Sequence, residues 1–167
     1  KSSTPAPCRV KIKEALSVIM NKDESSLIQF IDDFRNEFKK LPAESIAYPR
    51  SCNNLKKYSS SKDIYQKGTP MHVRGALIYN NLLNQHKLKK YETINDGDKI
   101  KFVQLKEPNP LRENIISFVG TLPKEFDLHR YIDYDTQFEK SFLDPLRFIV
   151  NAIDWSFERQ STLDDFF

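Results

Sequence analysis

Basic residues are concentrated in the middle of this sequence, where their charge would suit a polyanion. Between Arg50 and Lys90, nine lysine and arginine side chains stand against a single acid, Asp63, which gives a local charge of +8. From Glu125 to the end, ten acids stand against four bases, a local charge of −6. Lysine and arginine bind nucleic-acid backbones by releasing counterions, whereas carboxylates repel phosphates. We therefore expect any nucleic acid to bind the middle of the chain.

Two segments of this basic stretch could place polar groups near phosphates. The run SCNN at 51–54 is rich in side chains that hydrogen bond to nearby backbone, and it predicts a loop. Thr69 and Pro70 combine a capping hydroxyl with a proline preset for the first helical position, so a helix is expected from Met71 to about Asn84. Helix N-termini favour phosphate oxygens. The first turn of this helix would carry His72 and Arg74.

The last eight residues, QSTLDDFF, form a second candidate binding element. On one helical turn Leu163, Phe166 and Phe167 would emerge on one face and enter a hydrophobic pocket, while Gln160 hydrogen bonds at the rim. This spacing matches the box by which proteins dock on sliding clamps. The alternative is that the terminal phenylalanines fold back onto the core. The box does not identify an activity, because nucleases, ligases and mismatch-repair proteins use the same handle.

Other chemistry has weaker support. Asp133 and Asp135 are two residues apart, and they are better interpreted as acids at a helix N-terminus than as metal ligands. Four glycines without a GxxxxGK pattern argue against a phosphate-binding glycine loop. A zinc site is not expected either, because no spaced cysteine partners accompany the histidines, which are His72, His86 and His129.

Bulk properties describe a folded, water-soluble chain. It has 167 residues, of which 39% are hydrophobic and 29% charged, and no apolar run approaches the length of a membrane span. No secretory signal opens the sequence, so we expect a cytoplasmic location, and a first residue Lys1 in place of Met favours an interior fragment. The widely separated Cys8 and Cys52 are expected to be reduced, structural thiols.

The N-terminal elements predict a helical hairpin. Thr4 and Pro5 begin a helix that should end near Asn21. Asp23 can cap a second helix that Pro42 stops. The apolar stripe of that second helix consists of Leu27, Ile31, Phe34 and Phe38.

Short strands and a broken helix should follow. Strands are expected at 45–48, 99–105 and 115–119, with a tight turn at Asn95-Asp96-Gly97. From Tyr134 the apolar residues fall on one helical face, but Pro145 should break that helix near Asp144 into two pieces. The fold class expected from these elements is α+β, mainly helical with a small sheet.

The order of the segments resembles the C-terminal region of T-even-like bacteriophage family B DNA polymerases. The resemblance runs from Lys1 to Phe167, and it rests on collinear order more than on any single motif. Its segments are KSSTP, SCNNLKKY, KGTPMHVRG, LKEPNP, YIDYDTQFEKSFLDPL and the terminal box. In that family the thumb straddles the minor groove of the primer-template duplex, and the chain terminus meets the sliding clamp. The resemblance therefore implies a thumb-like fold with an exposed tail.

Residue by residue, the resemblance implies two sets of contacts. The thumb positions that would hold duplex DNA are Asn53, Asn54, Lys57, Tyr58, Lys67, His72 and Arg74. The clamp contacts would be Gln160, Leu163, Phe166 and Phe167. The thumb positions also lie in the basic stretch, where lysines neutralise phosphates and amides fix register without reading bases.

The resemblance also implies what this chain lacks. Polymerase chemistry needs carboxylates that hold two metal ions, and the family's motifs for them are not present, so Mg²⁺ is expected only in the palm of the full polymerase. We expect a fragment or split subunit that is inactive alone and holds no cofactor. Its partners would be primer-template DNA, the sliding clamp and the catalytic palm and exonuclease part, without a membrane, in the host cytoplasm. The expected divisions are a palm-proximal helical hairpin at 1–43, a DNA-binding thumb at 44–157 and a clamp-binding tail at 158–167.

Two alternatives remain open. One is a non-catalytic adaptor that binds duplex DNA and recruits a sliding clamp, because it would show the same basic stretch and tail. The other is a clamp-tethered nuclease, for which the sequence offers only the Asp133 and Asp135 pair.

Overall fold

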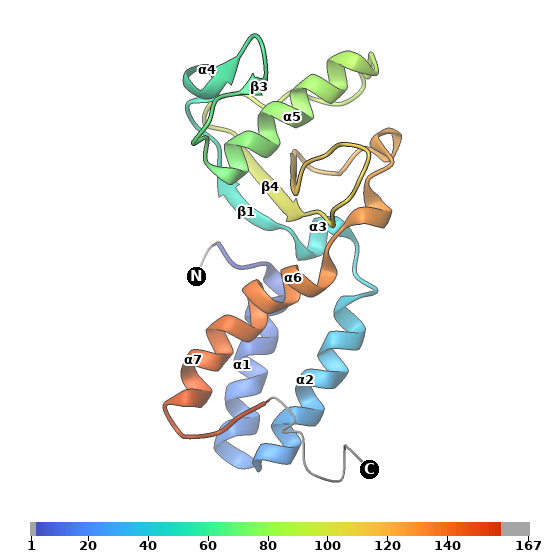
Figure 1. The fold of residues 1–167 in the computed structure, drawn as a ribbon. Helices are drawn as coiled ribbons and strands as arrows, with labels where there is room; N and C mark the ends of the chain where they lie inside the picture. The colour runs from blue at the N-terminus through green and yellow to red at the C-terminus, as the bar shows by residue number, and fades with distance from the viewer. Residues whose placement is uncertain (1–2, 158–167) are drawn as a thin grey trace.

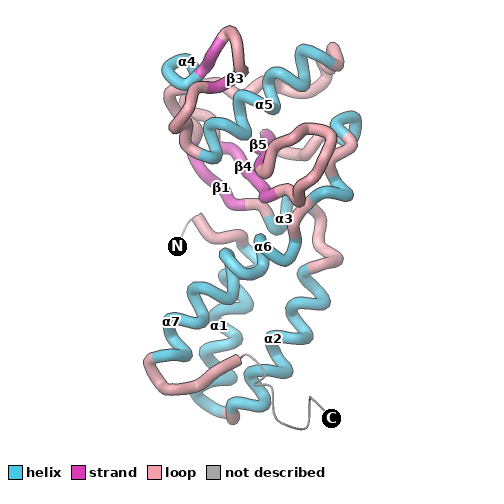
Figure 2. The backbone as a smooth tube through the Cα atoms, in the orientation of Figure 1, coloured by secondary structure: helices cyan, strands magenta, loops and turns pink. Residues whose placement is uncertain are grey.

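Helices and a small antiparallel sheet make up the molecule (Figures 1 and 2). The computed structural model describes residues 3–157. It confirms the α+β class, whereas likeness to a polymerase thumb stays a prediction. The clamp-box residues Gln160, Leu163, Phe166 and Phe167 lie outside the described residues.

The N-terminal helical hairpin is present as expected. It consists of α1 (Ala6–Asn21) and α2 (Glu24–Phe38). Asp23 caps α2, because its Oδ1 accepts a hydrogen bond of 2.9 Å from the Ser26 backbone N–H. The prediction for the start of α1 was wrong in detail: Pro5 is the N-cap itself and no side chain caps the helix. A second proline, Pro7, occupies the first turn, where a missing N–H costs nothing.

The first strand lies later in the chain than predicted. Residues Ala43–Ile46 form a short helix, α3, and strand β1 covers Tyr48–Ser51. Pro42 both follows α2 and begins this turn, since its carbonyl accepts a hydrogen bond from Ser45 N at 3.0 Å. The expected strand at 45–48 is therefore corrected to 48–51, because local helical bonds occupy the backbone before Ala47.

The main sheet has the strand order β1-β4-β5, with β1 on the edge. Strands β4 (Lys99–Gln104) and β5 (Ile115–Phe118) confirm the two later strands within a residue. The β1–β4 pairing is antiparallel and sets Ser51 opposite Lys99. Between β1 and α5 the chain forms α4 (Leu55–Tyr58) and a two-stranded hairpin of β2 (Ser59–Ser60) and β3 (Ile64–Tyr65).

Helix α5 (Met71–Gln85) packs directly on β5, and its bounds confirm the predicted helix within a residue. A Cβ built on Gly75 would meet the side chain of Ser117 and lie 2.7 Å from the Ser117 backbone nitrogen. The Ser117 hydroxyl donates to the His72 carbonyl at 2.8 Å, which pins the first turn of α5 to the sheet. The predicted cap was wrong, because the Thr69 hydroxyl turns back to the Gln66 carbonyl and Pro70 is the N-cap.

After β5 the chain returns to the helical hairpin. The 3₁₀ turns η1 (Lys124–Phe126) and η2 (His129–Tyr131) lead to α6 (Tyr134–Phe138) and α7 (Asp144–Asn151). The two helical pieces expected on either side of Asp144 are present as α6 and α7, but no break separates them, because a π-helical turn, η3 (Glu139–Leu143), joins them. The wider turn carries the helix up to Pro145, whose ring and missing N–H would disturb a regular α-helix.

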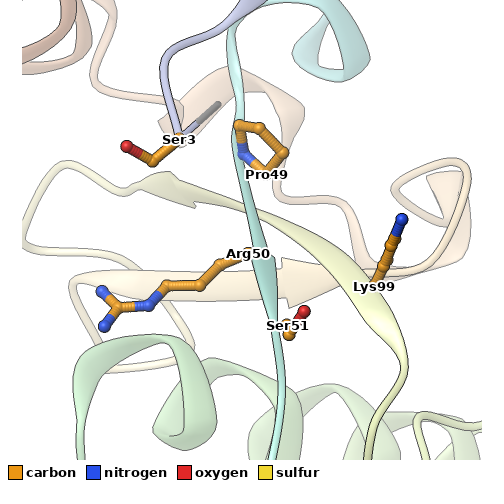
Figure 3. Close-up of a pocket in the computed structure, with 5 residues that line it drawn as sticks. All are labelled: Ser3, Pro49, Arg50, Ser51 and Lys99. Carbon is orange, nitrogen blue, oxygen red and sulfur yellow. The ribbon is translucent and has the colours of Figure 1, made fainter. Parts of the chain in front are cut away.

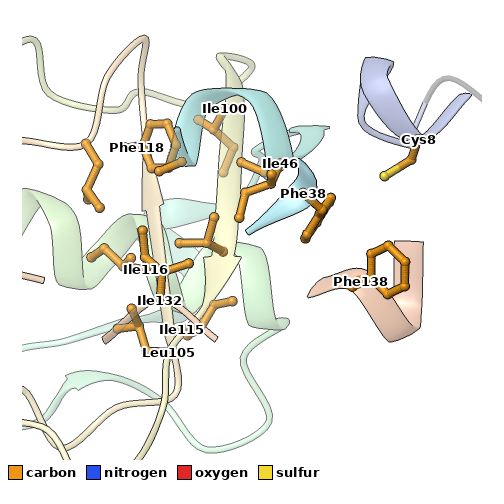
Figure 4. Close-up of a cluster of buried hydrophobic side chains, with 14 of the residues drawn as sticks. Cys8, Phe38, Ile46, Ile100, Leu105, Ile115, Ile116, Phe118, Ile132 and Phe138 are labelled. Atoms are coloured by element: carbon orange, nitrogen blue, oxygen red, sulfur yellow. The ribbon is translucent and has the colours of Figure 1, made fainter. Parts of the chain in front are cut away.

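The core has two neighbouring parts. Mostly aliphatic side chains of the sheet and α5 form one part, which includes Ile100, Ile116 and the ring of Phe118 (Figure 4). The other is an aromatic cluster on the helical hairpin and its returning helix, in which the rings of Phe34 and Phe142 lie 4.8 Å apart. Helices from both sides of the expected boundary at residue 43 thus pack together, and the predicted domain divisions stay untested.

A buried amide joins the two parts. Gln137, which is fully buried, accepts a hydrogen bond of 2.9 Å from Gln104 N at the end of β4. It also donates one of 3.0 Å to the carbonyl of Ile46 at the end of α3. This side chain therefore links α6 to the end of β4 and to the end of α3. Within residues 3–157, no helix combines the length and apolar character needed to cross a membrane.

Candidate nucleic-acid interface

The loop that carries Asn53 and Asn54 is held from behind by the turn at 95–98. Cys52 N donates to the Asp98 carbonyl at 2.9 Å, and Gly97 N donates to the Cys52 carbonyl at 2.7 Å. Both asparagines are exposed, and Asn54 has a left-handed φ of 65°, which asparagine tolerates. The predicted tight turn is confirmed by the Asp98 N to Asn95 O bond of 3.1 Å. A rigid support thus presents both amides to solvent.

Lys57 and Tyr58 follow on α4, next to the hairpin. The Lys57 ammonium lies 5.2 Å from the centre of the Tyr58 ring. Gln66 ties this helix to the second strand of the hairpin, because its side chain donates to the carbonyls of Lys57 and Ser59 at 3.1 Å. Lys57 is exposed and Tyr58 is half-buried, so the charge faces solvent while the ring supports it.

The three remaining predicted thumb residues differ in their accessibility. Lys67 is exposed in the turn before α5. Arg74 is half-buried and donates from Nη2 to Asn114 Oδ1 at 2.7 Å, while its guanidinium carbon lies 5.8 Å from the centre of the Tyr65 ring. His72 is only 9% exposed. Its ring centre lies 6.2 Å from that of Phe102.

Burial, with the nearby charge of Arg50 as a second cause, lowers the pKa of His72 from its ordinary value of 6.5. Folding therefore favours the neutral imidazole. Stability from this residue is fully present above pH 6.5 and is lost as pH falls from there to the lowered pKa of the folded state.

We expect His72→Gln to reduce the loss of unfolding free energy on acidification from pH 7.5 to 5. Urea titrations of both proteins at the two pH values measure this difference. Equal losses in wild type and variant would show that His72 carries none of the pH dependence.

Two cations that are not among the predicted DNA contacts lie beside this region. Arg50 on β1 and Lys99 on β4 line an open pocket of about 680 Å³, together with Ser3, Pro49 and Ser51 (Figure 3). The antiparallel register pairs Ser51 with Lys99 and Arg50 with Ile100, so the two cations lie on neighbouring strands at alternate positions. Their side chains extend in opposite directions in Figure 3. The alternation of charged and apolar residues in KIKF at 99–102 could have indicated an exposed basic strand face.

The basic stretch does not form one continuous surface. Lys87, Lys89 and Lys90 follow the C-terminal end of α5, a helix of 15 residues and roughly 22 Å, whereas Lys57 and Lys67 precede its start (Figure 1). Lys90 also forms an ion pair of 2.8 Å with Glu125. The candidate interface is therefore the end of the molecule that carries β1, α4 and the start of α5.

The acids that resembled a metal site have a structural role. Asp133 caps α6, as predicted, by accepting a hydrogen bond from Thr136 N at 3.1 Å, and Asp135 lies 3.9 Å from Lys39 Nζ. In the described part of the chain, no group of three potential ligands could hold a metal ion. The expectation about Mg²⁺ concerns another part of a polymerase and stays a prediction. Cys8 and Cys52 are free, buried thiols, as expected.

Comparison with known proteins relates this chain to phage DNA polymerases. No protein-family model matches it. It is 30% identical over 171 residues to the DNA-directed DNA polymerase of Enterobacteria phage T4, and 31% identical over 172 residues to that of Escherichia phage RB69. Each match covers 100% of this chain and 19% of the relative. The chain is thus related to one region of these polymerases and spans about a fifth of their length.

Proposed function

We propose that this chain is the thumb of a phage family B DNA polymerase, which grips primer-template duplex DNA and ends in a clamp-docking peptide. The observation that carries the proposal is the similarity to two phage DNA polymerases along the entire chain. Because both relatives are polymerases, it also favours this function over a clamp-recruiting adaptor or a tethered nuclease. A phage polymerase would work in the host cytoplasm.

The proposed grip consists of contacts between side chains of this protein and the phosphate backbone of DNA. Exposed cations on and beside β1, α4 and the start of α5 can neutralise phosphates. These cations are Arg50, Lys57, Lys67 and Lys99. Asn53 and Asn54 add amides that can fix the register of the duplex, and Tyr58 supports Lys57. Such contacts do not depend on sequence, which suits an enzyme that copies any template.

Arg74 and His72 complete the proposed DNA-binding set. Arg74 is anchored by Asn114 and Tyr65 at the start of α5, so its remaining N–H groups have a fixed direction. His72 exposes the least surface of the set, and we expect its effect on duplex binding to be smaller than that of Lys57.

The chemistry of nucleotide addition is proposed to lie in the catalytic palm of the full polymerase, where Mg²⁺ would be bound. This chain would then contribute grip and tethering without activity of its own. The tether would be the terminal peptide, in which Gln160, Leu163, Phe166 and Phe167 have the spacing of a clamp-docking box.

Removing one proposed phosphate contact should weaken duplex binding and its salt dependence together. Lys57→Gln removes the charge and keeps the first two methylene groups of the stem. The slope of log K against log salt should fall in magnitude by about one, similarly for unrelated duplex sequences. Fluorescence anisotropy of labelled duplexes across a salt series measures this slope.

Lys40→Gln is the matched control, because Lys40 is an exposed lysine in the turn after α2, on the helical hairpin. It should leave the slope unchanged. Equal effects of the two substitutions would mean that net charge alone, and not the proposed interface, attracts DNA.

A further inference from the structure

The short helix that carries Lys57 begins without a cap from its own loop. Its N-cap residue, Asn54, makes no side-chain capping bond. The Leu55 backbone N–H instead donates to Oδ1 of Asp96 at 2.8 Å, across 41 positions of sequence. Leu55 is buried, so this bond holds the buried start of α4. The first turn of the helix therefore depends on a distant acid.

Asp96 comes from a firmly held turn. The Asn95–Asp98 turn is closed by a main-chain bond of 3.1 Å, and Asp98 Oδ2 accepts from Asn95 N at 2.8 Å. The same turn makes two main-chain hydrogen bonds with Cys52, through the Asp98 carbonyl and the Gly97 N–H. Asp96 thus connects this turn to Leu55, the first residue of α4. Because Lys57 and Tyr58 lie on the same short helix, their orientation depends on this connection.

The charge of Asp96 has the wrong sign for a DNA-binding surface. A carboxylate next to the proposed contacts repels phosphates and lowers duplex affinity. Its closeness to the loop is also visible at Cys52, where burial first, and then the charges of Asp96 and Asp98, raise the thiol pKa to about 11. An acid in this place is understandable if its acceptor oxygen is needed for geometry.

We propose that Asp96 is a positioning residue for the DNA grip: its carboxylate caps α4 and holds Lys57 and Tyr58 in the orientation that meets the duplex. The inference rests on the proposed function. It predicts that two substitutions with the same change of charge have different effects on DNA binding.

Asp96→Asn and Asp96→Ala both remove one negative charge, but asparagine keeps an acceptor oxygen and is as good a capping residue as aspartate. Asp96→Asn should bind duplex DNA as tightly as wild type or more tightly. Asp96→Ala should bind about threefold or more weakly than Asp96→Asn, because a fraction of molecules leaves the competent loop conformation. Hydrogen exchange at the Leu55 amide should be accelerated only in Asp96→Ala.

The matched control is the same pair of substitutions at Asp63, an exposed acid at the tip of the neighbouring hairpin. Hydrogen bonds at Asp63 involve its main chain, with Ser60 and Tyr65. Asp63→Asn and Asp63→Ala should therefore give equal Kd values. Thermal melts of the 167-residue chain verify that each variant is folded.

The possible results distinguish the positioning role of Asp96 from the proposed binding of duplex DNA. Different Kd values for the Asp96 pair, with equal values for the Asp63 pair, support the positioning role. Equal Kd values for the Asp96 pair overturn that role while duplex binding by wild type still stands. A wild-type chain that does not bind duplex DNA in low salt overturns both.

Discussion

Replacing Gly75 with alanine should lower the free energy of unfolding by about 3 kcal/mol, the upper part of the range for overpacked interiors. In an open helix this change would stabilise the protein by about 1 kcal/mol. Here the new methyl group would lie 2.7 Å from the Ser117 backbone nitrogen and 3.2 Å from the Ile116 carbonyl carbon. Because these backbone atoms belong to β5, they cannot move away without shifting the strand. The destabilisation from this clash therefore exceeds the gain that alanine brings as a better helix former.

Urea denaturation followed by circular dichroism measures the effect, and Asn84→Ala on the exposed end of the same helix is the control, with a change within about 0.5 kcal/mol. Ser117→Gly in the Gly75→Ala background should restore only part of the loss, since the backbone contacts remain. Unchanged stability of Gly75→Ala would contradict the close packing of α5 on β5.

Changing Leu163, Phe166 and Phe167 together to alanine should weaken binding to the proposed partner, a sliding clamp, by about 100-fold or more, because buried aromatic anchors carry most of the energy in such interfaces. Isothermal titration of clamp with wild type and variant measures the loss. Duplex affinity should stay unchanged, since the proposed DNA contacts lie on other segments.

Ser161→Ala with Thr162→Ala is the matched control within the box, because these residues lie between Gln160 and the apolar positions. Clamp affinity should change little. If the triple variant binds the clamp like wild type but melts at a lower temperature, the phenylalanines pack on the core and the docking proposal fails.

Features determined by nearby residues could be predicted from the sequence. The cap of α2 by Asp23, the tight turn at Asn95 and the extent of α5 all depend on residues within one or two turns. The first strand was misplaced because Pro42 can end one helix and also begin another, and the main-chain bonds that decide between these outcomes are not visible in composition.

The candidate site was only partly predictable for a similar reason. Asn53, Asn54, Lys57 and Tyr58 share one short segment, so any fold keeps them together. The placement of Lys99 on the strand beside Arg50 depends on strand pairing, and the hydrogen bond from Leu55 to Asp96 joins residues 41 positions apart. The length of α5 separates Lys87, Lys89 and Lys90 from the rest, although the sequence places all of them in one basic stretch.

The most direct test of the DNA grip is the salt dependence of duplex binding by the wild-type chain. Four exposed phosphate contacts predict that log K falls linearly with log salt with a slope of about −4, and that unrelated duplex sequences bind alike. A slope near zero, or no binding at low salt, would contradict the proposal that this part of the molecule holds primer-template DNA.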